Sequence, residues 1–214
     1  MADPSLYGYF RSSAAYRVRI ALNLKNVPAE TVSVHLRKGE QRGGAHLALN
    51  PAGLVPVWRE DDGFTLGQSL AIIEYLDELH PEPPLLPADP RLRAWTREIA
   101  LTIACDIHPL GNLRVLERLT SEFGADAGAR KLWYRHWMAL GFTAIEARLA
   151  QTAGRHAVGD APTLADICLV PQLYNARRFG LDLTLYPRLV AVDEAARALP
   201  AFAAAAPERQ PDSE

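Results

Sequence analysis

Cysteine is scarce in this sequence, with Cys105 and Cys168 the only two in 214 residues. A disulfide-stapled secreted scaffold is therefore excluded, because such scaffolds carry more cysteines in shorter chains. The two thiols form no CxxC pair, so metal binding and thioredoxin-type redox chemistry are both unsupported, and no metal is expected. Each cysteine lies in an apolar stretch with helical spacing, and we expect two buried free thiols.

An excess of charge of either sign is also missing. The formal net charge is −2, and the charged residues, 22% of the chain, are spread along it with both signs. This composition excludes a nucleic-acid footprint and a polybasic membrane anchor. No apolar run has the length of a bilayer span, and residues 1–4 lack the basic and apolar parts of a signal peptide. We therefore expect a cytoplasmic protein with no membrane and no nucleic-acid partner.

Apolar residues, in contrast, make up 49% of the chain, which is enough for an ordinary globular core. The first part of the sequence alternates short strand and helix patterns, and this order favours an α/β fold. Asp61-Asp62-Gly63 predicts a hairpin turn between its last two strands. The expected strands cover residues 5–8, 31–36, 54–58 and 64–66, and the expected helices cover residues 14–24, 45–49 and 70–79.

Prolines concentrate in residues 81–90 and indicate a domain boundary. The sequence thus predicts an α/β domain over residues 1–83 and an all-helical domain over residues 90–214. The polar tail, residues 207–214, is expected to fray. Within the second domain, the expected helices cover residues 91–119, 126–150, 164–179 and 187–206.

Two adjacent hydroxyls, Ser12 and Ser13, stand between the first expected strand and the first expected helix. A serine at this point can cap the helix by accepting from its first N–H groups. The same position lies beside the positive helix end, where a hydroxyl can donate to a bound thiolate. A hydrogen bond to a charged group contributes about 1.5–3 kcal/mol, which corresponds to about one to two pKa units on the thiol. Both roles remain open.

Two further turns carry possible ligand contacts. Val55-Pro56 opens a strand; such a proline fits an edge strand, and it is also a candidate for a cis bond that leaves the Val55 backbone available to an outside peptide. Ser69, after Gln68, is the expected N-cap of the next helix, whose N-terminus would favour a carboxylate. Together with the serine turn, these segments predict a binding site for an extended peptide that carries a carboxylate and a thiol.

Several segments of the chain resemble one known family. Residues 10–22, Phe-Arg-Ser-Ser-Ala-Ala-Tyr-Arg-Val-Arg-Ile-Ala-Leu, resemble the signature of zeta-class glutathione transferases, which include maleylacetoacetate and maleylpyruvate isomerases. Residues 50–56 and 68–76 are similar to the glutathione-binding segment of that family, and residues 163–166 resemble the capping box of its helical domain. One position departs from the pattern, because Ala14 replaces the cysteine of the usual Ser-Ser-Cys. Glutathione would then supply the only sulfur.

The resemblance implies a fold, a cofactor and a set of roles. The fold is the glutathione transferase fold, with an α/β thioredoxin-like N-terminal domain and an all-α C-terminal domain, in a homodimer. The cofactor is glutathione, and the substrate is a small dicarboxylate, a maleyl keto acid isomerised from cis to trans. The implied roles are catalysis by Ser12, Ser13 and Arg11, glutathione binding by Gln41, Val55, Pro56, Gln68, Ser69, Asp106 and His108, and substrate binding by Arg11, Arg114, Arg177 and Arg178.

Arginine suits the substrate role because its guanidinium binds planar carboxylates bidentately. Arg17 and Arg19, in contrast, are assigned to structure. Two other functions remain open: a general glutathione transferase or dehalogenase that acts on small electrophiles, and a non-catalytic binding module. An apolar pocket without arginine would favour the general transferase, whereas the serine turn and Gln68-Ser69 argue against the binding module.

Overall fold

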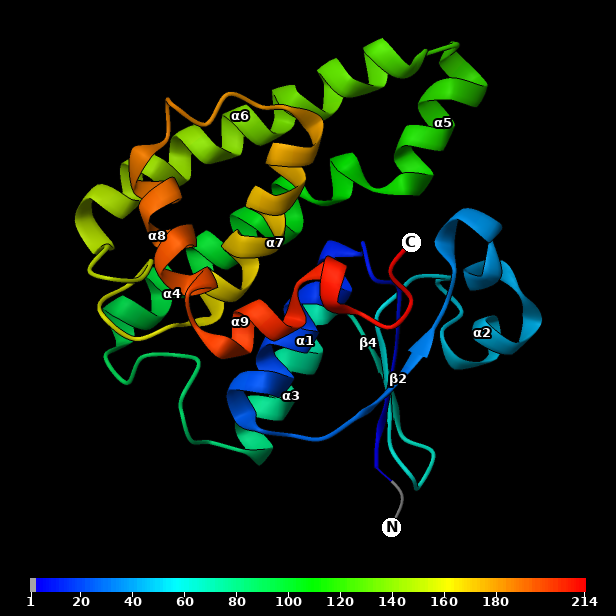
Figure 1. The fold of residues 1–214 in the computed structure, drawn as a ribbon, viewed down its shortest axis with the longest axis horizontal. Coiled ribbons are helices and arrows are strands. Elements are labelled where there is room, and N and C mark those ends of the chain that lie inside the picture. Colours follow the sequence, from blue (N-terminus) through cyan, green and yellow to red (C-terminus); the bar gives the residue numbers. More distant parts are fainter. Residues whose placement is uncertain (1–2) are drawn as a thin grey trace. The chain divides into compact units, whose positions relative to one another are not determined.

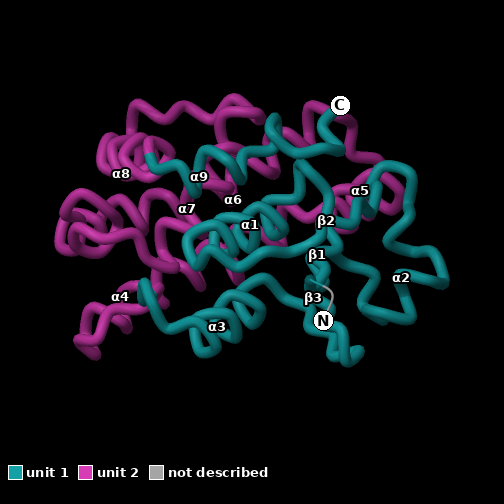
Figure 2. The backbone as a smooth tube through the Cα atoms, turned by 60° about the horizontal axis from the view of Figure 1, so that its bottom comes forward, with its two compact units in different colours: residues 1–84, 199–214 teal, residues 85–198 magenta. Residues whose placement is uncertain are grey.

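The structure, a computed structural model, describes residues 3–214 as two compact units. Unit 1 extends to Pro84 and resumes from Leu199 to Glu214, and unit 2 comprises Leu85–Ala198 (Figure 2). The sequence placed residues 199–214 in the helical domain. The structure groups them with the α/β part instead, because their contacts are made there.

Unit 1 contains a four-stranded sheet in the order β2-β1-β3-β4 (Figure 1). The strands are β1 (Ser5–Gly8), β2 (Glu30–Ser33), β3 (Val57–Arg59) and β4 (Thr65–Gly67), and the helices are α1 (Ser13–Lys25), α2 (Gly44–Leu49), α3 (Ser69–Leu79) and α9 (Pro200–Ala205). β1 and β2 are parallel, whereas β3 is antiparallel to β1 and β4. The predicted order of strands and helices in the α/β part is confirmed, although β2 and β3 are shorter than expected.

The core of unit 1 lies between the sheet and the pair α1 and α3, while α2 lies on the other side of the sheet (Figure 1). Leu6 and Trp58 from the strands, and Ile20 and Ile72 from the helices, belong to this core, and each of the four is at most 2% exposed. Burial of one such side chain contributes about 1.5–3 kcal/mol. This packing holds the ends of β1 and β3 and the start of α1 in fixed positions.

Arg19 links the start of the chain to its C-terminal segment. Its side chain is buried, and burial lowers the pKa of its guanidinium to about 10. Nη2 donates to the carbonyl of Phe10 at 3.0 Å, and Nε donates to the carbonyl of Ala205 at 3.1 Å. The Ala205 carbonyl lies at the end of α9, where helix carbonyls lack partners within the helix. The structural role predicted for Arg19 is therefore confirmed.

Unit 2 consists of helices and their connections. The helices are α4 (Pro90–Leu101), α5 (Leu113–Phe123), α6 (Ala127–Thr152), α7 (Leu164–Phe179) and α8 (Pro187–Arg197). Two expected helices are interrupted. The first, over residues 91–119, gives way to a π-helical turn at Thr102–Ile107 and a 3-10 turn at Pro109–Gly111. The second, over residues 187–206, breaks before Pro200, where Leu199 is extended, because proline disfavours a helical conformation of the residue before it.

The capping box predicted at the start of α7 is confirmed. Thr163 is the N-cap, and its Oγ1 accepts from the backbone of Ala165 at 3.3 Å. Asp166 reaches back to accept from the Thr163 N–H at 2.8 Å and also accepts from the Ala157 N–H at 2.9 Å. Asp166 is fully buried, so these hydrogen bonds satisfy a carboxylate that would otherwise be costly.

One expectation about unit 2 was wrong. Cys168 is buried as expected, but Cys105, which lies in the π-helical turn, is exposed. By length and composition alone, the helical stretch Pro90–Phe123 could cross a membrane, a property that core helices of soluble proteins also have. That stretch includes the π-helical turn with Asp106, and a carboxylate is expensive at mid-bilayer depth. We therefore treat it as part of the helical unit.

Candidate active site

Three predicted turns meet at one end of the sheet of unit 1. Tyr7 pairs with Val57, and Val57 pairs in turn with Gly67 on the other side. β1 leads from this rung into the serine turn, Val55-Pro56 leads into β3, and β4 leads into the start of α3. Because all three segments adjoin the same rung, the structure brings them to the same end of the sheet.

Ser12 is the N-cap of α1. Its Oγ accepts from the Ala15 N–H at 3.2 Å, and its own N–H donates to the Tyr9 carbonyl at 2.9 Å. A hydroxyl that accepts one hydrogen bond still has its own hydrogen to donate. Capping and thiolate donation are therefore compatible at Ser12. Ser13 is the first residue of α1 and is buried, so the half-buried Ser12 is the more accessible of the two hydroxyls.

The segment before β3 is held by α2. His46 Nε2 lies 2.9 Å from the Leu54 carbonyl oxygen, and Asn50 Nδ2 donates to the same oxygen at 2.9 Å. The Val55-Pro56 bond is cis, and the pairing of β3 begins only at Val57. The backbone of Val55 therefore lies outside the strand ladder, where an extended ligand can pair with it.

The start of α3 differs from the sequence prediction. The N-cap is Gln68, and Ser69 is the first helical residue, so the prediction that Ser69 caps this helix was wrong. Its hydroxyl accepts instead from Nη1 of the buried Arg17 at 3.3 Å. Gln68 has φ +67°, a left-handed conformation that is uncommon outside glycine and that clusters at functional sites. The first N–H groups of α3 point away from the helix and suit an anion.

Gln41 has a buried side chain whose amide oxygen accepts no hydrogen bond from the described residues. It lies in the 3-10 turn Glu40–Arg42 and is 5% exposed. Within residues 3–214 its Oε1 has no hydrogen-bond donor. Leaving a buried acceptor unpaired costs about 1–3 kcal/mol, so Gln41 has an acceptor available for a donor that the described residues do not supply.

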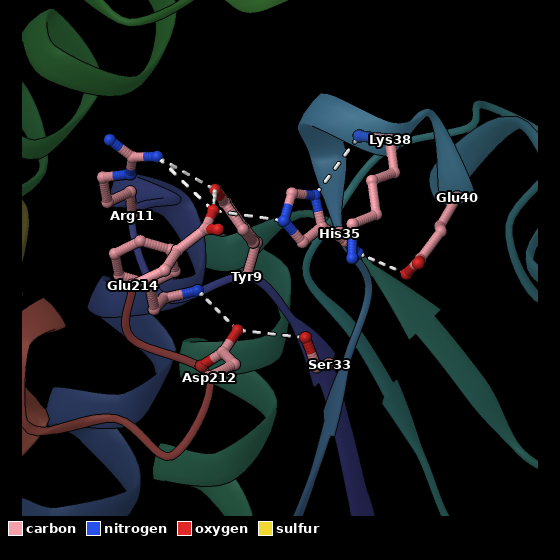
Figure 3. A network of polar contacts seen from close by, with 9 residues as sticks. Tyr9, Arg11, Ser33, His35, Lys38, Glu40, Asp212 and Glu214 are labelled. Atoms are coloured by element: carbon pink, nitrogen blue, oxygen red, sulfur yellow. Dashed lines mark hydrogen bonds and ion pairs between the residues drawn. The ribbon is translucent and has the colours of Figure 1, made fainter.

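Arg11 lies beside Ser12 in the same turn and is surrounded by aromatic and polar groups (Figure 3). Its guanidinium carbon lies 4.8 Å from the centre of the Phe10 ring, and Nη2 donates to Tyr9 Oη at 3.2 Å. Nη2 is also 3.7 Å from Glu214 Oε1. The side chain of Arg11 is 27% exposed, so its charge is oriented by neighbours and still open to a ligand.

Three of the predicted residues lie around the π-helical turn of unit 2. Asp106 is in that turn, His108 follows it, and Arg114 is in the first turn of α5. Asp106 and Arg114 are exposed, and His108 is half-buried. Single π-helical turns are frequent at functional sites, and no local sequence pattern indicated this one. The turn places the three side chains within one short stretch of unit 2.

Arg177 and Arg178 at the end of α7 have different surroundings. Arg177 Nη2 donates to Asp193 Oδ2 at 2.6 Å, and Asp193 is fully buried. Burial raises the pKa of Asp193, while the hydrogen bond and charge of Arg177 act in the opposite direction. Arg178 is exposed and lies over the ring of Phe179, 4.7 Å from its centre. Arg177 therefore has a structural partner, and Arg178 is the more available cation.

The sequence missed several residues that the structure adds to this region. His46 and Asn50 hold Leu54, and Tyr9, His35 and Glu214 surround Arg11. The signal for the first pair was weak, since His46 and Asn50 sit within and just after a short helix. Glu214 is separated from Tyr9 by 205 positions, and no local pattern could have connected them.

The sequence of the chain matches one family of known proteins. The family model described as "Glutathione S-transferase, N-terminal domain" matches residues 11–79. A probable maleylacetoacetate isomerase of Vibrio cholerae is 51% identical over 210 residues, covering 97% of both chains. A maleylpyruvate isomerase of a Ralstonia species is also 51% identical over 210 residues, covering 97% of this chain and 99% of that one.

Solved structures agree with the sequence relatives. The holo structure of a maleylpyruvate isomerase, described as a bacterial zeta-class glutathione S-transferase, has a TM-score of 0.95 and 50% identity, covering 98% of this chain and all of that one. A maleylacetoacetate isomerase of Methylobacterium extorquens, solved with bound malonate and glutathione, has a TM-score of 0.95 and 42% identity, covering 98% and 99%. Similarity thus extends over nearly the full length of the chain.

Proposed function

Because this chain belongs to the zeta-class glutathione transferase family, we propose that it is a glutathione-dependent isomerase that converts a maleyl keto acid to its fumaryl isomer. The substrate is maleylpyruvate or maleylacetoacetate, and the reaction belongs to the breakdown of aromatic compounds. The observation that carries the proposal is the gathering of Ser12, Val55 and the start of α3 at one end of the sheet. We also infer that the protein works in the cytoplasm.

An assay of both substrates tests this function directly. Isomerisation of maleylpyruvate and of maleylacetoacetate is followed by absorbance, with and without glutathione. We expect turnover of at least one of them that requires glutathione. Turnover of neither, or turnover at the same rate without glutathione, would contradict the proposal, and retention on glutathione-agarose would then separate a general transferase from a binding module.

The residues at this end of unit 1 fit glutathione. The peptide backbone of such a ligand can pair with Val55, and a carboxylate can bind the first N–H groups of α3 at Gln68 and Ser69. The unmatched Oε1 of Gln41 can accept from an N–H group of the ligand. We further propose that Pro56 shapes this contact, and that Asp106 and His108 contribute to glutathione binding from unit 2.

When bound, glutathione supplies a thiol that adds reversibly to the carbon–carbon double bond and thereby allows rotation about it. Ser12 donates a hydrogen bond from its hydroxyl to the sulfur, and this hydrogen bond stabilises the thiolate form. Arg11, fixed over Phe10, binds a substrate carboxylate. Ser13 is the second candidate donor. Oriented donors of this kind stabilise negative charge that develops during reaction, since they need no rearrangement.

Arginines of unit 2 complete the proposed contacts to the dicarboxylate. Arg114 and Arg178 are exposed and can each meet a carboxylate. Arg177 is the weaker candidate because the buried Asp193 already accepts its hydrogen bond. A maleyl keto acid carries two carboxylates, so two cations are sufficient to match its charge.

Ser69→Ala is expected to weaken glutathione binding about tenfold, because the Ser69 hydroxyl accepts from Arg17 and keeps its own hydrogen to donate to the carboxylate, and a hydrogen bond to a charged group contributes at least about this much. The dissociation constant is measured by calorimetry. Ser121→Ala, the same change on the exposed face of α5, is the control and should bind glutathione normally. Because Ser69 also accepts from Arg17, the unfolding midpoint is recorded for both variants. Unchanged affinity in a folded Ser69→Ala protein would place the carboxylate elsewhere.

We propose that the protein is a homodimer. The family supports this, and so do large apolar side chains that are exposed on unit 2, among them Phe123 at 77% and Leu132 at 68%. Sedimentation equilibrium at micromolar concentration should give the mass of two chains. Leu132→Glu should shift the mass toward one chain if α6 lies in the interface, and a wild-type mass of one chain would refute the dimer.

A further inference from the structure

The C-terminal segment folds back onto the serine turn (Figure 3). The sequence predicted that residues 207–214 fray, and this was wrong. Pro207–Arg209 forms a 3-10 turn, and Gln210 Nε2 donates to the carbonyls of Ala204 at 3.0 Å and Ala206 at 2.9 Å. The hydrogen bonds of Gln210 therefore hold the segment against the C-terminal end of α9.

Asp212 is the second attachment of this segment. Its Oδ2 accepts from the Phe10 N–H at 3.0 Å and from Ser33 Oγ at 3.1 Å. The carbonyl of Phe10 accepts from Arg19, so both backbone polar groups of this residue are engaged two residues before Ser12. The hydrogen bonds of Asp212 do not involve Glu214. A substitution of Glu214 therefore leaves the segment attached to unit 1 through Asp212.

Glu214 then presents its carboxylate to three polar side chains (Figure 3). Oε1 accepts from Tyr9 Oη at 3.0 Å, lies 3.1 Å from His35 Nε2 and lies 3.7 Å from Arg11 Nη2. The hydrogen bond from Tyr9, followed by the charges of His35 and Arg37, lowers the pKa of Glu214. The three groups thus favour a carboxylate in its charged form.

The donors around this carboxylate are oriented by contacts of their own. His35 Nδ1 accepts from the Lys38 N–H at 3.2 Å, so a neutral His35 ring carries its hydrogen on Nε2, the nitrogen that faces Glu214. The ring of Tyr9 packs against Phe10 at 4.7 Å and His35 at 5.2 Å between centres. Unit 1 therefore holds the donors without help from Glu214.

We propose that Tyr9, Arg11 and His35 form a binding site for one carboxylate of the substrate, and that Glu214 is an internal carboxylate that competes for it. The proposal rests on the proposed function, because it extends the role of Arg11 to two neighbours. The apparent affinity of a ligand that needs this site is its intrinsic affinity multiplied by the fraction of time that Glu214 leaves the site free. The side chain of Glu214 is 49% exposed, so its interaction with the three side chains contributes only a modest free energy.

Glu214→Gln tests the competition, with malonate as the probe and glutathione present throughout. The change keeps the size of the side chain and removes its charge. Exposed ion pairs are weak, and we expect the dissociation constant of malonate, measured by calorimetry, to fall about two- to fivefold. Glu208→Gln is the matched control, since it removes the same charge from an exposed residue of the same segment and should leave malonate binding unchanged.

Tyr9→Phe, made in the Glu214→Gln protein, tests the site itself. We expect it to weaken malonate binding about tenfold, because a hydrogen bond to a carboxylate is lost while the ring packing remains. Equal malonate affinity in Glu214→Gln and Glu208→Gln would overturn the competition. No effect of Tyr9→Phe, or no malonate binding by any variant, would overturn the site. Because malonate binding needs no turnover, a failed isomerase assay would reject the proposed function and leave this result separate.

Discussion

Replacing Arg11 by alanine is expected to lower kcat/KM for isomerisation of a maleyl keto acid about a hundredfold. Arg11 is oriented by the Phe10 ring at 4.8 Å and by Tyr9, beside the serine that we assign to the thiolate. A dicarboxylate that enters this turn loses water, and the arginine compensates for its charge. Loss of one partner of such a pair costs about 2–5 kcal/mol, and each 1.4 kcal/mol corresponds to about tenfold. Steady-state assays with both keto acids measure the change.

The loss should be selective for the second substrate. Glutathione affinity and conjugation of an uncharged electrophile should remain close to wild type in Arg11→Ala. Arg59→Ala is the matched control, since it removes an exposed arginine from β3 of the same unit. Isomerisation near the wild-type rate in Arg11→Ala would reject the carboxylate role and favour a general transferase.

Two arginines at the end of α7, Arg177 and Arg178, can be tested in the same way, but they are not equally suitable. Arg177→Ala removes the 2.6 Å partner of the buried Asp193, so a loss of activity would be mixed with a loss of stability. Arg178→Ala avoids this, because Arg178 lies over Phe179 on the surface of unit 2. Its kcat/KM for the keto acids is the cleaner measurement of a contribution from α7.

Ser12→Ala is the second change with a large expected effect. We expect the pKa of bound glutathione's thiol to rise by about one to two units, which is the contribution of one hydrogen bond to a charged group. At a pH below the thiol pKa of the wild-type complex, the thiolate fraction, and kcat with it, should fall about ten- to hundredfold. Ultraviolet titration of the bound thiolate measures the shift. A larger shift in Ser13→Ala than in Ser12→Ala would reverse the assignment.

Ser12 is also a helix cap, and this second role needs its own control. Loss of the cap is expected to lower the free energy of unfolding by about 1 kcal/mol. Asp126→Ala removes the cap of α6, where Asp126 Oδ1 accepts from the Ala129 N–H at 2.7 Å. That variant should show a similar loss of stability with no shift in the thiol pKa, which separates the two roles of Ser12.

Local patterns predicted most of the fold and only part of the site. The period of apolar residues placed α1, α3 and α7 within one residue of their ends, because these helices are stabilised by one buried face or by a cap. The serine turn and the Val55 segment were also found, since turn residues and proline have local signatures. The π-helical turn at Thr102–Ile107 has no such signature and was missed.

The contacts that the sequence could not predict are long-range. Ser69 was expected to cap α3, but the buried Arg17 from α1 takes its hydroxyl as an acceptor 52 positions away. Asp212 and Glu214 looked like solvated residues in a polar tail, and their partners lie 202 and 205 positions earlier. Polar side chains of this kind carry no apolar period, so the chain gives no local sign that they are used.

The return of residues 199–214 to unit 1 also sets an order for biosynthesis. The serine turn is translated before unit 2, yet Arg19 and Phe10 receive their partners Ala205 and Asp212 only after the whole of unit 2. At about 5–20 residues per second, the nascent α/β part waits on the order of ten seconds for that segment. During this time the guanidinium of Arg19 in α1 lacks its hydrogen bond to the carbonyl of Ala205. A part of unit 1 that is translated before unit 2 is thus completed only after unit 2 has been made.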